Sequence, residues 1–167
     1  MSETCSSCGK VITPKGEKGD TGPTGPQGPA GTATTPVIDM NTGVVALLPA
    51  DTGSRVLMSG PSSATLPTDP PVGTNYTFTT VTDLSSGVFS IAATGGNIMS
   101  GYVYANSSAA ATEIFKPIAA NNTITLDGGA TGGNVGTNIT TTYVGSSMWT
   151  VSGTTMSDAA VLTTPFS

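Results

Sequence analysis

Glycine recurs at every third position in one stretch near the start of the chain, and this repeat constrains the fold more than any other feature. Proline follows the glycine three times, at Pro23, Pro26 and Pro29. Three polyproline-II chains wind into a collagen triple helix only if every third residue is glycine, because nothing larger fits at the axis. The repeat therefore predicts a collagen-like stalk over residues 15–32 rather than a flexible Gly/Pro linker. The glycines expected at the triple-helix axis are Gly16, Gly19, Gly22, Gly25, Gly28 and Gly31.

The stalk is short, and we do not expect it to hold three chains together alone. Its six triplets span on the order of 50 Å at roughly 3 Å per residue. A neighbouring trimeric domain raises the effective concentration of the three strands and so stabilises a short triple helix. Residues 33–167 are therefore expected to form a trimerising head domain, and residues 1–14 a separate peptide on the far side of the stalk.

The head has the pattern of an all-β domain. Only 9% of the residues in the chain are charged, and β-branched residues alternate with apolar ones. Tyr76 and Phe78 are expected on one face of a strand, with Thr77 and Thr79 on the other. Turn sequences rich in Gly, Asp and Pro separate about ten such segments, which predicts a β-sandwich of jelly-roll type. The expected strands are residues 44–48, 54–59, 62–66, 75–82, 87–92, 98–105, 112–118, 123–126, 138–144 and 148–151.

Several segments between residues 47 and 153 follow one another in a familiar order. Thr65-Leu66-Pro67 leads to a Gly73–Phe78 strand, and Trp149-Thr150-Val151 closes the series. This order resembles a domain common in tailed-phage virion proteins, namely head fibres, capsid decoration proteins and tail fibres. The resemblance implies a trimer on the virion surface, in which a collagen-like stalk in front of such a head is a recurring arrangement. Arg55 departs from the family pattern, which usually has Lys there.

The leader contains the two cysteines of the chain, Cys5 and Cys8. One CxxC motif supplies two of the four ligands that zinc normally takes, although a trimer brings six cysteines together. Free thiols, interchain or local disulfides and a shared metal site at Cys5 and Cys8 therefore all stay open. We expect residues 1–14 to anchor the protein to a capsid or another virion structural protein.

Composition argues against several functions. The net charge is −5 and there is no histidine, so we expect neither a nucleic-acid partner nor His-based acid–base catalysis. No apolar run is long enough to span a membrane. The leader lacks an apolar signal-peptide core, which predicts synthesis in the host cytoplasm. Asp69 and Asp127 stand directly beside Pro or Gly, where Asp is a turn residue, and no spacing marks a catalytic pair among the carboxylates of the head. We therefore expect a non-enzymatic protein without a cofactor.

A host-surface glycan is a further candidate partner. Tyr102, Tyr104 and Asn106, if exposed, would form a shallow sugar platform. The favoured interpretation is that these aromatic side chains pack within the sandwich or in the trimer interface. Trp149 is likewise expected in the core.

These features together predict a homotrimeric head fibre or capsid decoration protein on the virion surface. It would be anchored by its N-terminus and would project its head for shell reinforcement or surface adhesion. Two alternatives remain open. One is a tail fibre with a glycan-recognising, receptor-binding tip, and the other is a collagen-like spore-surface protein.

Overall fold

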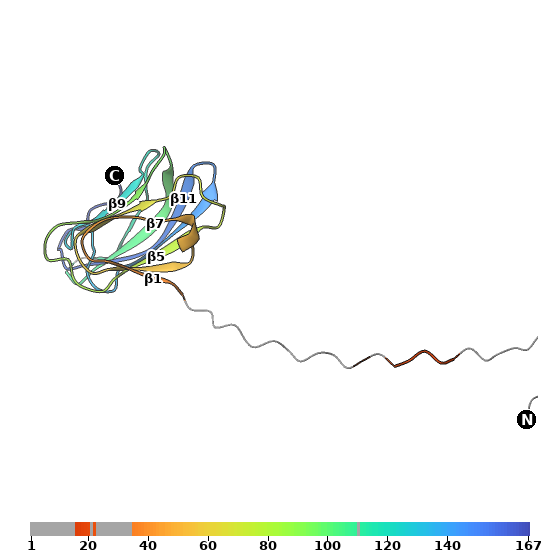
Figure 1. Ribbon diagram of the computed structural model, residues 1–167. Helices are drawn as coiled ribbons and strands as arrows, with labels where there is room; N and C mark the ends of the chain where they lie inside the picture. Colours follow the sequence, from red (N-terminus) through yellow and green to blue (C-terminus); the bar gives the residue numbers. More distant parts are fainter. Residues whose placement is uncertain (1–15, 21, 23–34, 110) are drawn as a thin grey trace, which may run out of the picture. The chain divides into compact units, whose positions relative to one another are not determined.

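The computed structural model describes residues 16–20, 22, 35–109 and 111–167. Every strand lies in one compact unit, Thr34–Ser167, which is shown in Figure 1. The unit is all-β, and its one helical segment among the described residues is the 3-10 turn η1 (Pro49–Asp51). The strands are β1 (Val37–Met40), β2 (Gly43–Ala46), β3 (Ser54–Met58), β4 (Ser62–Leu66), β5 (Asn75–Thr80), β6 (Phe89–Ala93), β7 (Ile98–Ser107), β8 (Glu113–Phe115), β9 (Thr123–Leu126), β10 (Asn138–Gly145) and β11 (Met148–Ser157).

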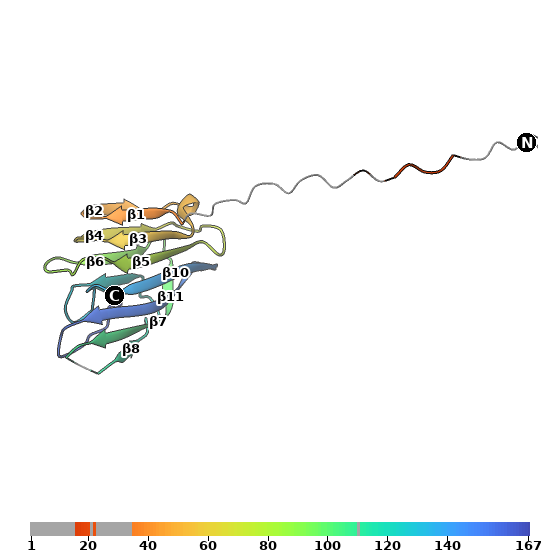
Figure 2. The same ribbon diagram turned by 90° about the horizontal axis from the view of Figure 1, so that it is seen from below.

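The strands form two sheets. Seven strands make the larger sheet, in the order β1-β3-β5-β10-β11-β7-β8, and four make the smaller sheet, in the order β2-β4-β6-β9. Figure 2 shows three successive pairs of strands, β1 with β2, β3 with β4 and β5 with β6. In each pair the first strand belongs to the larger sheet and the second to the smaller sheet. β1 and β2 are therefore the edge strands at one end of the two sheets.

The first six strands alternate between the two sheets. We call one strand in the larger sheet together with the next strand in the smaller sheet a circuit of the chain. Successive circuits wind in the same direction, so neighbouring strands of each sheet run parallel. The register is continuous from circuit to circuit: Ile38 pairs with Val56, and Val56 pairs with Phe78. The later strands close the sheets with antiparallel pairs, β5 with β10, β10 with β11 and β6 with β9, while β7 runs parallel to β11.

The predicted all-β class is confirmed, but the jelly-roll topology is wrong for the first half of the domain. A jelly roll consists of antiparallel Greek keys, whereas β1, β3 and β5 are parallel, as are β2, β4 and β6. The physical reason is that over β1–β6 the chain keeps winding in one direction, so each strand enters its sheet in the same orientation as the strand beside it. The spacing of short strands is similar in both arrangements, so the alternating pattern does not distinguish them.

Each of the ten predicted strand segments overlaps a strand of the structure. The segment predicted at 75–82 is β5, and its Tyr76 and Phe78 are buried as expected. β11 extends to Ser157, beyond the predicted end at residue 151, because it pairs with β7 along its whole length. β1 is not among the predicted strands, since four residues beside a proline give too little alternation to stand out.

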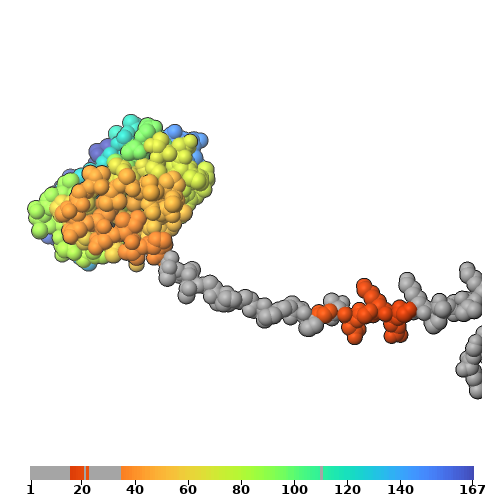
Figure 3. Space-filling view, viewed as in Figure 1, coloured from red at the N-terminus to blue at the C-terminus, as the bar shows by residue number. Residues whose placement is uncertain are grey.

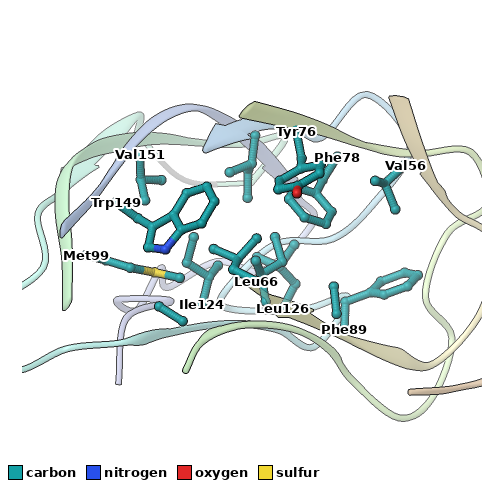
Figure 4. Packing of buried hydrophobic residues seen from close by; sticks show 14 of the residues in the cluster. Val56, Leu66, Tyr76, Phe78, Phe89, Met99, Ile124, Leu126, Trp149 and Val151 are labelled. Carbon is teal, nitrogen blue, oxygen red and sulfur yellow. The ribbon is translucent and has the colours of Figure 1, made fainter. Parts of the chain in front are cut away.

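Inward-pointing residues of both sheets form the core, as Figure 4 shows. Trp149 is fully buried, and its ring centre lies 6.0 Å from that of Tyr76 and 5.3 Å from that of Tyr143. The prediction that Trp149 belongs to the core is confirmed. Burying each large side chain contributes about 1.5–3 kcal/mol. The other large, fully buried side chains are Phe78, Phe89, Met40, Met58, Leu66, Ile91, Ile124, Leu126 and Ile139.

The two tyrosines beside Trp149 each fasten a loop to the core. The Tyr76 hydroxyl donates to the Leu48 carbonyl oxygen, and the Tyr143 hydroxyl donates to Asp69 Oδ1, both at 2.7 Å. Burial, followed by the nearby Asp51 carboxylate, raises the pKa of Tyr76 to about 12. The hydrogen bond to Asp69 is the main cause of a raised pKa at Tyr143. A buried phenol needs such a partner for its polar end.

Candidate functional site

The outer face of the seven-stranded sheet carries a regular array of side chains. Alternation along each strand turns every second residue away from the core. The register then aligns these residues in rows that run across β3, β5, β10, β11 and β7. One row consists of Arg55, Thr77, Thr140, Ser152 and Tyr102, and the next of Leu57, Thr79, Asn138, Thr154 and Tyr104.

The middle of this outer face is built from short hydroxyl and amide side chains. The Thr77 and Thr140 hydroxyls hydrogen bond across the strands at 3.3 Å, and the Asn138 amide donates to Thr79 Oγ1 at 3.2 Å. Cross-strand pairs of this kind add a few tenths of a kcal/mol to about 1 kcal/mol each. They also hold the polar side chains in place, so the middle of the face is neutral and hydrogen bonding.

An exposed aromatic pair lies on the β7 side of the face. Tyr102 and Tyr104 are 43% and 41% exposed, and their rings meet edge to face with centres 5.3 Å apart. Ile114 of β8 pairs with Tyr104 and is 55% exposed. The interpretation that these tyrosines pack within the sandwich is therefore wrong, and the alternative that they pack in a trimer interface stays a prediction. Their inward neighbours Val103 and Ala105 fill the core positions of β7 instead.

Asn106 continues the outward-facing series of β7 two residues after Tyr104. Its Oδ1 accepts a hydrogen bond from the Thr112 hydroxyl at 2.7 Å, which orients the amide group and leaves its NH₂ as a donor. The three residues of the predicted sugar platform thus share one strand and one face. Aromatic rings beside fixed polar groups are a general arrangement for binding a small polar ligand.

A shallow pocket of about 330 Å³ lies on the β1 side of the same sheet. Thr35, Val37, Gly53, Arg55 and Thr77 line it. Arg55 supplies a positive charge next to hydroxyl groups and an apolar side chain. The pocket is open to solvent, which suits a site that anchors a carboxylate through Arg55 better than it suits an enclosed catalytic site.

The carboxylates of the domain take part in local structure. Asp51 accepts from the Leu48 amide at 2.9 Å, Asp83 accepts from the Val135 amide at 2.6 Å, and Asp69 holds Tyr143. Among the described residues, no group of three or more His, Cys, Asp or Glu is placed to hold a metal ion. Asp51, Asp69 and Asp83 therefore stabilise loops.

Asp127 shows the same role most fully. Its Oδ1 accepts from the Gly129 amide at 2.8 Å, from the Thr131 amide at 3.1 Å and from the Thr131 hydroxyl at 2.8 Å. Burial alone would raise the pKa of Asp127, but these hydrogen bonds stabilise the carboxylate and leave its pKa below the usual value. The side chain closes the β9–β10 connection and is not directed at a cleft.

The sites predicted from the repeat and the leader fall largely outside the described residues. This holds for Cys5 and Cys8, for the anchor peptide 1–14, and for the glycines at positions 25, 28 and 31. Gly16, Gly19 and Gly22 are described, and among the described residues nothing lies within 4 Å of the position that a Cβ would take at any of them.

No family model matches this chain, and a comparison with curated proteins found no significant match. The resemblance to phage virion domains therefore stays a prediction. In the part of the chain that the structure describes, we find no helix with the length and apolarity needed to cross a membrane.

Sequence reasoning found the aromatic residues of the face, and of its two favoured placements for them the one inside the sandwich is wrong. Aromatic side chains are normally core residues, but in β7 Tyr102 and Tyr104 lie on the solvent-exposed face. The smaller residues Met99, Val103 and Ala105 point inward. The alternation alone allows either face, so the missing signal was the pairing with β11 and β8. The Arg55 pocket had no signal in sequence, because it depends on β1 lying beside β3.

Proposed function

We propose that this protein is a non-enzymatic, homotrimeric structural protein of a virion surface, a head fibre or capsid decoration protein. Residues 1–14 attach it to the capsid, residues 15–32 form a collagen-like stalk, and residues 33–167 form the projecting β-rich head. The proposal needs no cofactor. The unbroken spacing of six glycines from Gly16 to Gly31 carries it, because a triple helix requires glycine at every third position.

Most glycines in the head have a positive φ or a close neighbour that requires glycine within a single chain. Gly101, for example, has a φ of 129° and stands against the Val151 carbonyl group. Gly16, Gly19 and Gly22 have neither a positive φ nor a neighbour within 4 Å among the described residues. A repeat of glycines that a single chain does not require is accounted for by the axis of a triple helix, where every third residue must lack a side chain.

The hydrogen-bond roles of the carboxylates support a structural protein over an enzyme. Asp51, Asp69, Asp83 and Asp127 are each engaged in loop or core contacts. A glycosidase needs two free carboxyl groups facing each other across a substrate, about 5–10 Å apart. These four carboxylates each serve a separate contact and do not form such a pair.

The oligomeric state and the location are directly testable. Sedimentation of the full chain at micromolar concentration should give a trimer, and circular dichroism should show a triple-helix component that a chain lacking residues 15–32 does not show.

Labelling of purified particles should find hundreds of copies on the shell, whereas a handful per particle indicates a tail fibre. A chain lacking residues 1–14 should still form trimers but should no longer attach to particles. A monomeric full chain contradicts the proposal.

A second candidate function is recognition of a surface glycan, which the exposed Tyr102–Tyr104 pair favours. Binding should be measured on an array of bacterial surface polysaccharides. Replacing both residues, Tyr102→Ala with Tyr104→Ala, should reduce binding at least tenfold, which corresponds to about 1.4 kcal/mol. Ile118→Ala, at a side chain 75% exposed outside this pair, is the matched control and should bind normally. Equal binding by all three proteins rules out this role.

A further inference from the structure

β1 and β2 leave one end of the domain open. Among the described residues β1 pairs only with β3, and β2 only with β4. The Ser59 amide donates to the Met40 carbonyl at 3.0 Å. In a parallel ladder the backbone groups of alternate residues point toward the same neighbour. The N–H and C=O groups of Val37 and Asp39 therefore point away from β3, and β2 has a free edge in the same way. Figure 3 shows these two strands, in orange, on the surface of the domain.

The apolar core is also incomplete at this end. Ile38 and Val45 point inward and pack against the core, yet they are only partly buried. Their counterparts one circuit later, Val56 and Ala64, are both 0% exposed. The difference arises because β3 and β4 are covered by strands on both sides and β1 and β2 are covered on one. A further layer over β1 and β2 would complete the burial.

Apolar side chains surround the open end. Val37, Val44 and Leu48 are 60%, 73% and 58% exposed. The one charged residue in Val37–Ala46 is Asp39, and its Oδ1 already accepts a hydrogen bond from the Ser59 hydroxyl at 2.7 Å. Native proteins protect free sheet edges with charged residues, bulges or a covering element, because an unprotected edge pairs with other chains. Asp39 is the one charge here, and apart from the shortness of β1 and β2 the edge has little of this protection, which favours a covering element.

We infer that the β1–β2 edge, formed by Val37–Met40, Gly43–Ala46 and Leu48, is the surface through which three copies of the head associate. This inference rests on the proposed trimeric stalk. Val37 follows Gly31, the last glycine of the repeat, by six positions. Six residues reach at most about 20 Å, so β1 of each chain begins within that distance of the end of a shared axis. The two partner copies are thus the nearest protein able to cover the edge, and a closed threefold interface leaves no β1–β2 edge free for further addition.

The interface is tested with a pair of equally exposed valines. Val44 lies on β2 at the edge, and Val72 lies in the β4–β5 loop beside Gly145; each is 73% exposed. Val44→Lys places three like charges at the proposed interface and should raise the dissociation constant of the full-length trimer by roughly tenfold or more. Val72→Lys should leave it unchanged. Both variants should keep the wild-type fluorescence of the buried Trp149, since neither substitution touches the core.

Cross-linking gives a second measurement that does not depend on weakening the trimer. In a Cys5→Ser, Cys8→Ser background, Val44→Cys treated with a bifunctional maleimide should form covalent dimers, the largest product that one thiol per chain allows, and Val72→Cys should stay monomeric on a denaturing gel. If the full chain is trimeric but Val44→Lys sediments as the wild type and Val44→Cys does not cross-link, the β1–β2 edge is not the interface, and the proposed trimer stands. If the wild-type chain is a monomer, both proposals fail.

Discussion

Tyr76 is a core residue whose single polar atom links the interior to a loop. Its ring packs against Trp149, and its hydroxyl donates to Leu48 at the start of the connection from β2 to β3. The same side chain therefore contributes apolar burial and fixes the loop that leads away from the open edge. Because the hydroxyl is buried, its ionisation is tied to the stability of the fold.

This link predicts a loss of stability at high pH. The pKa of Tyr76 is about 12 in the folded domain and about 10 in an unfolded chain. The contribution of the protonated hydroxyl is complete below about pH 10 and is lost as the pH rises toward about 12. The melting temperature should fall over this range, and less steeply in Tyr76→Phe. Tyr102→Phe, at an exposed ring, should follow the wild type; if Tyr76→Phe does so too, Tyr76 is not the responsible group.

Ser146 and Ser147 are the two central residues of the turn between β10 and β11, and both have a positive φ, 54° and 56°. A two-residue hairpin turn of this kind normally uses Asn and Gly, because a residue with a Cβ is strained there. Ser147→Gly should therefore stabilise the domain by about 0.5–1 kcal/mol. Chemical denaturation measures the change. Ser86→Gly, at a position without a positive φ, should be neutral or destabilising; an equal gain in both would contradict the explanation.

At the scale of the elements, the contact between β7 and β11 depends on a glycine. Gly101 pairs with Val151 and has a φ of 129°, and a Cβ there would collide with the Val151 carbonyl oxygen. Gly101→Ala should destabilise the domain by about 3 kcal/mol, because both the φ and the contact are unfavourable. Gly96→Ala, at a positive φ in open space, should lose only about 1 kcal/mol. Urea unfolding of the two variants separates crowding from φ strain.

The elements also show how far the sequence predicts this fold. Tyr76 and Phe78 alternate with threonines, and this pattern placed β5 and its buried face correctly. Hydrophobic alternation reports which side of a strand is buried, but it carries no information on which strand lies next to it. β1 was missed because four residues show too little alternation, whereas the parallel order of the strands and the outward tyrosines of β7 follow from neighbours that are distant in sequence. For the same reason Arg55 could not be assigned to a pocket before β1 was placed beside it.

At the scale of the whole molecule, the stalk and the head are expected to depend on each other unequally. Six triplets make a marginal triple helix, so the head supplies most of the association and the stalk benefits from the proximity it creates. The apolar β1–β2 edge is the part of the head suited to that role. Weakening the stalk should therefore remove its own structure first and leave the heads associated.

Substitution of a stalk glycine tests this order. Gly22→Ser places a side chain at the crowded axis and should abolish the triple-helix signal in circular dichroism. Trp149 fluorescence should report an unchanged head, because Trp149 is buried within a single copy. Sedimentation should still show trimers, which dissociate at a higher concentration than the wild type. Thr24→Ala, at a position away from the axis, is the control and should keep the signal. If Gly22→Ser yields monomers at all concentrations, the stalk and not the β1–β2 edge provides the association, because the loss of a marginal stalk alone cannot separate heads that hold one another.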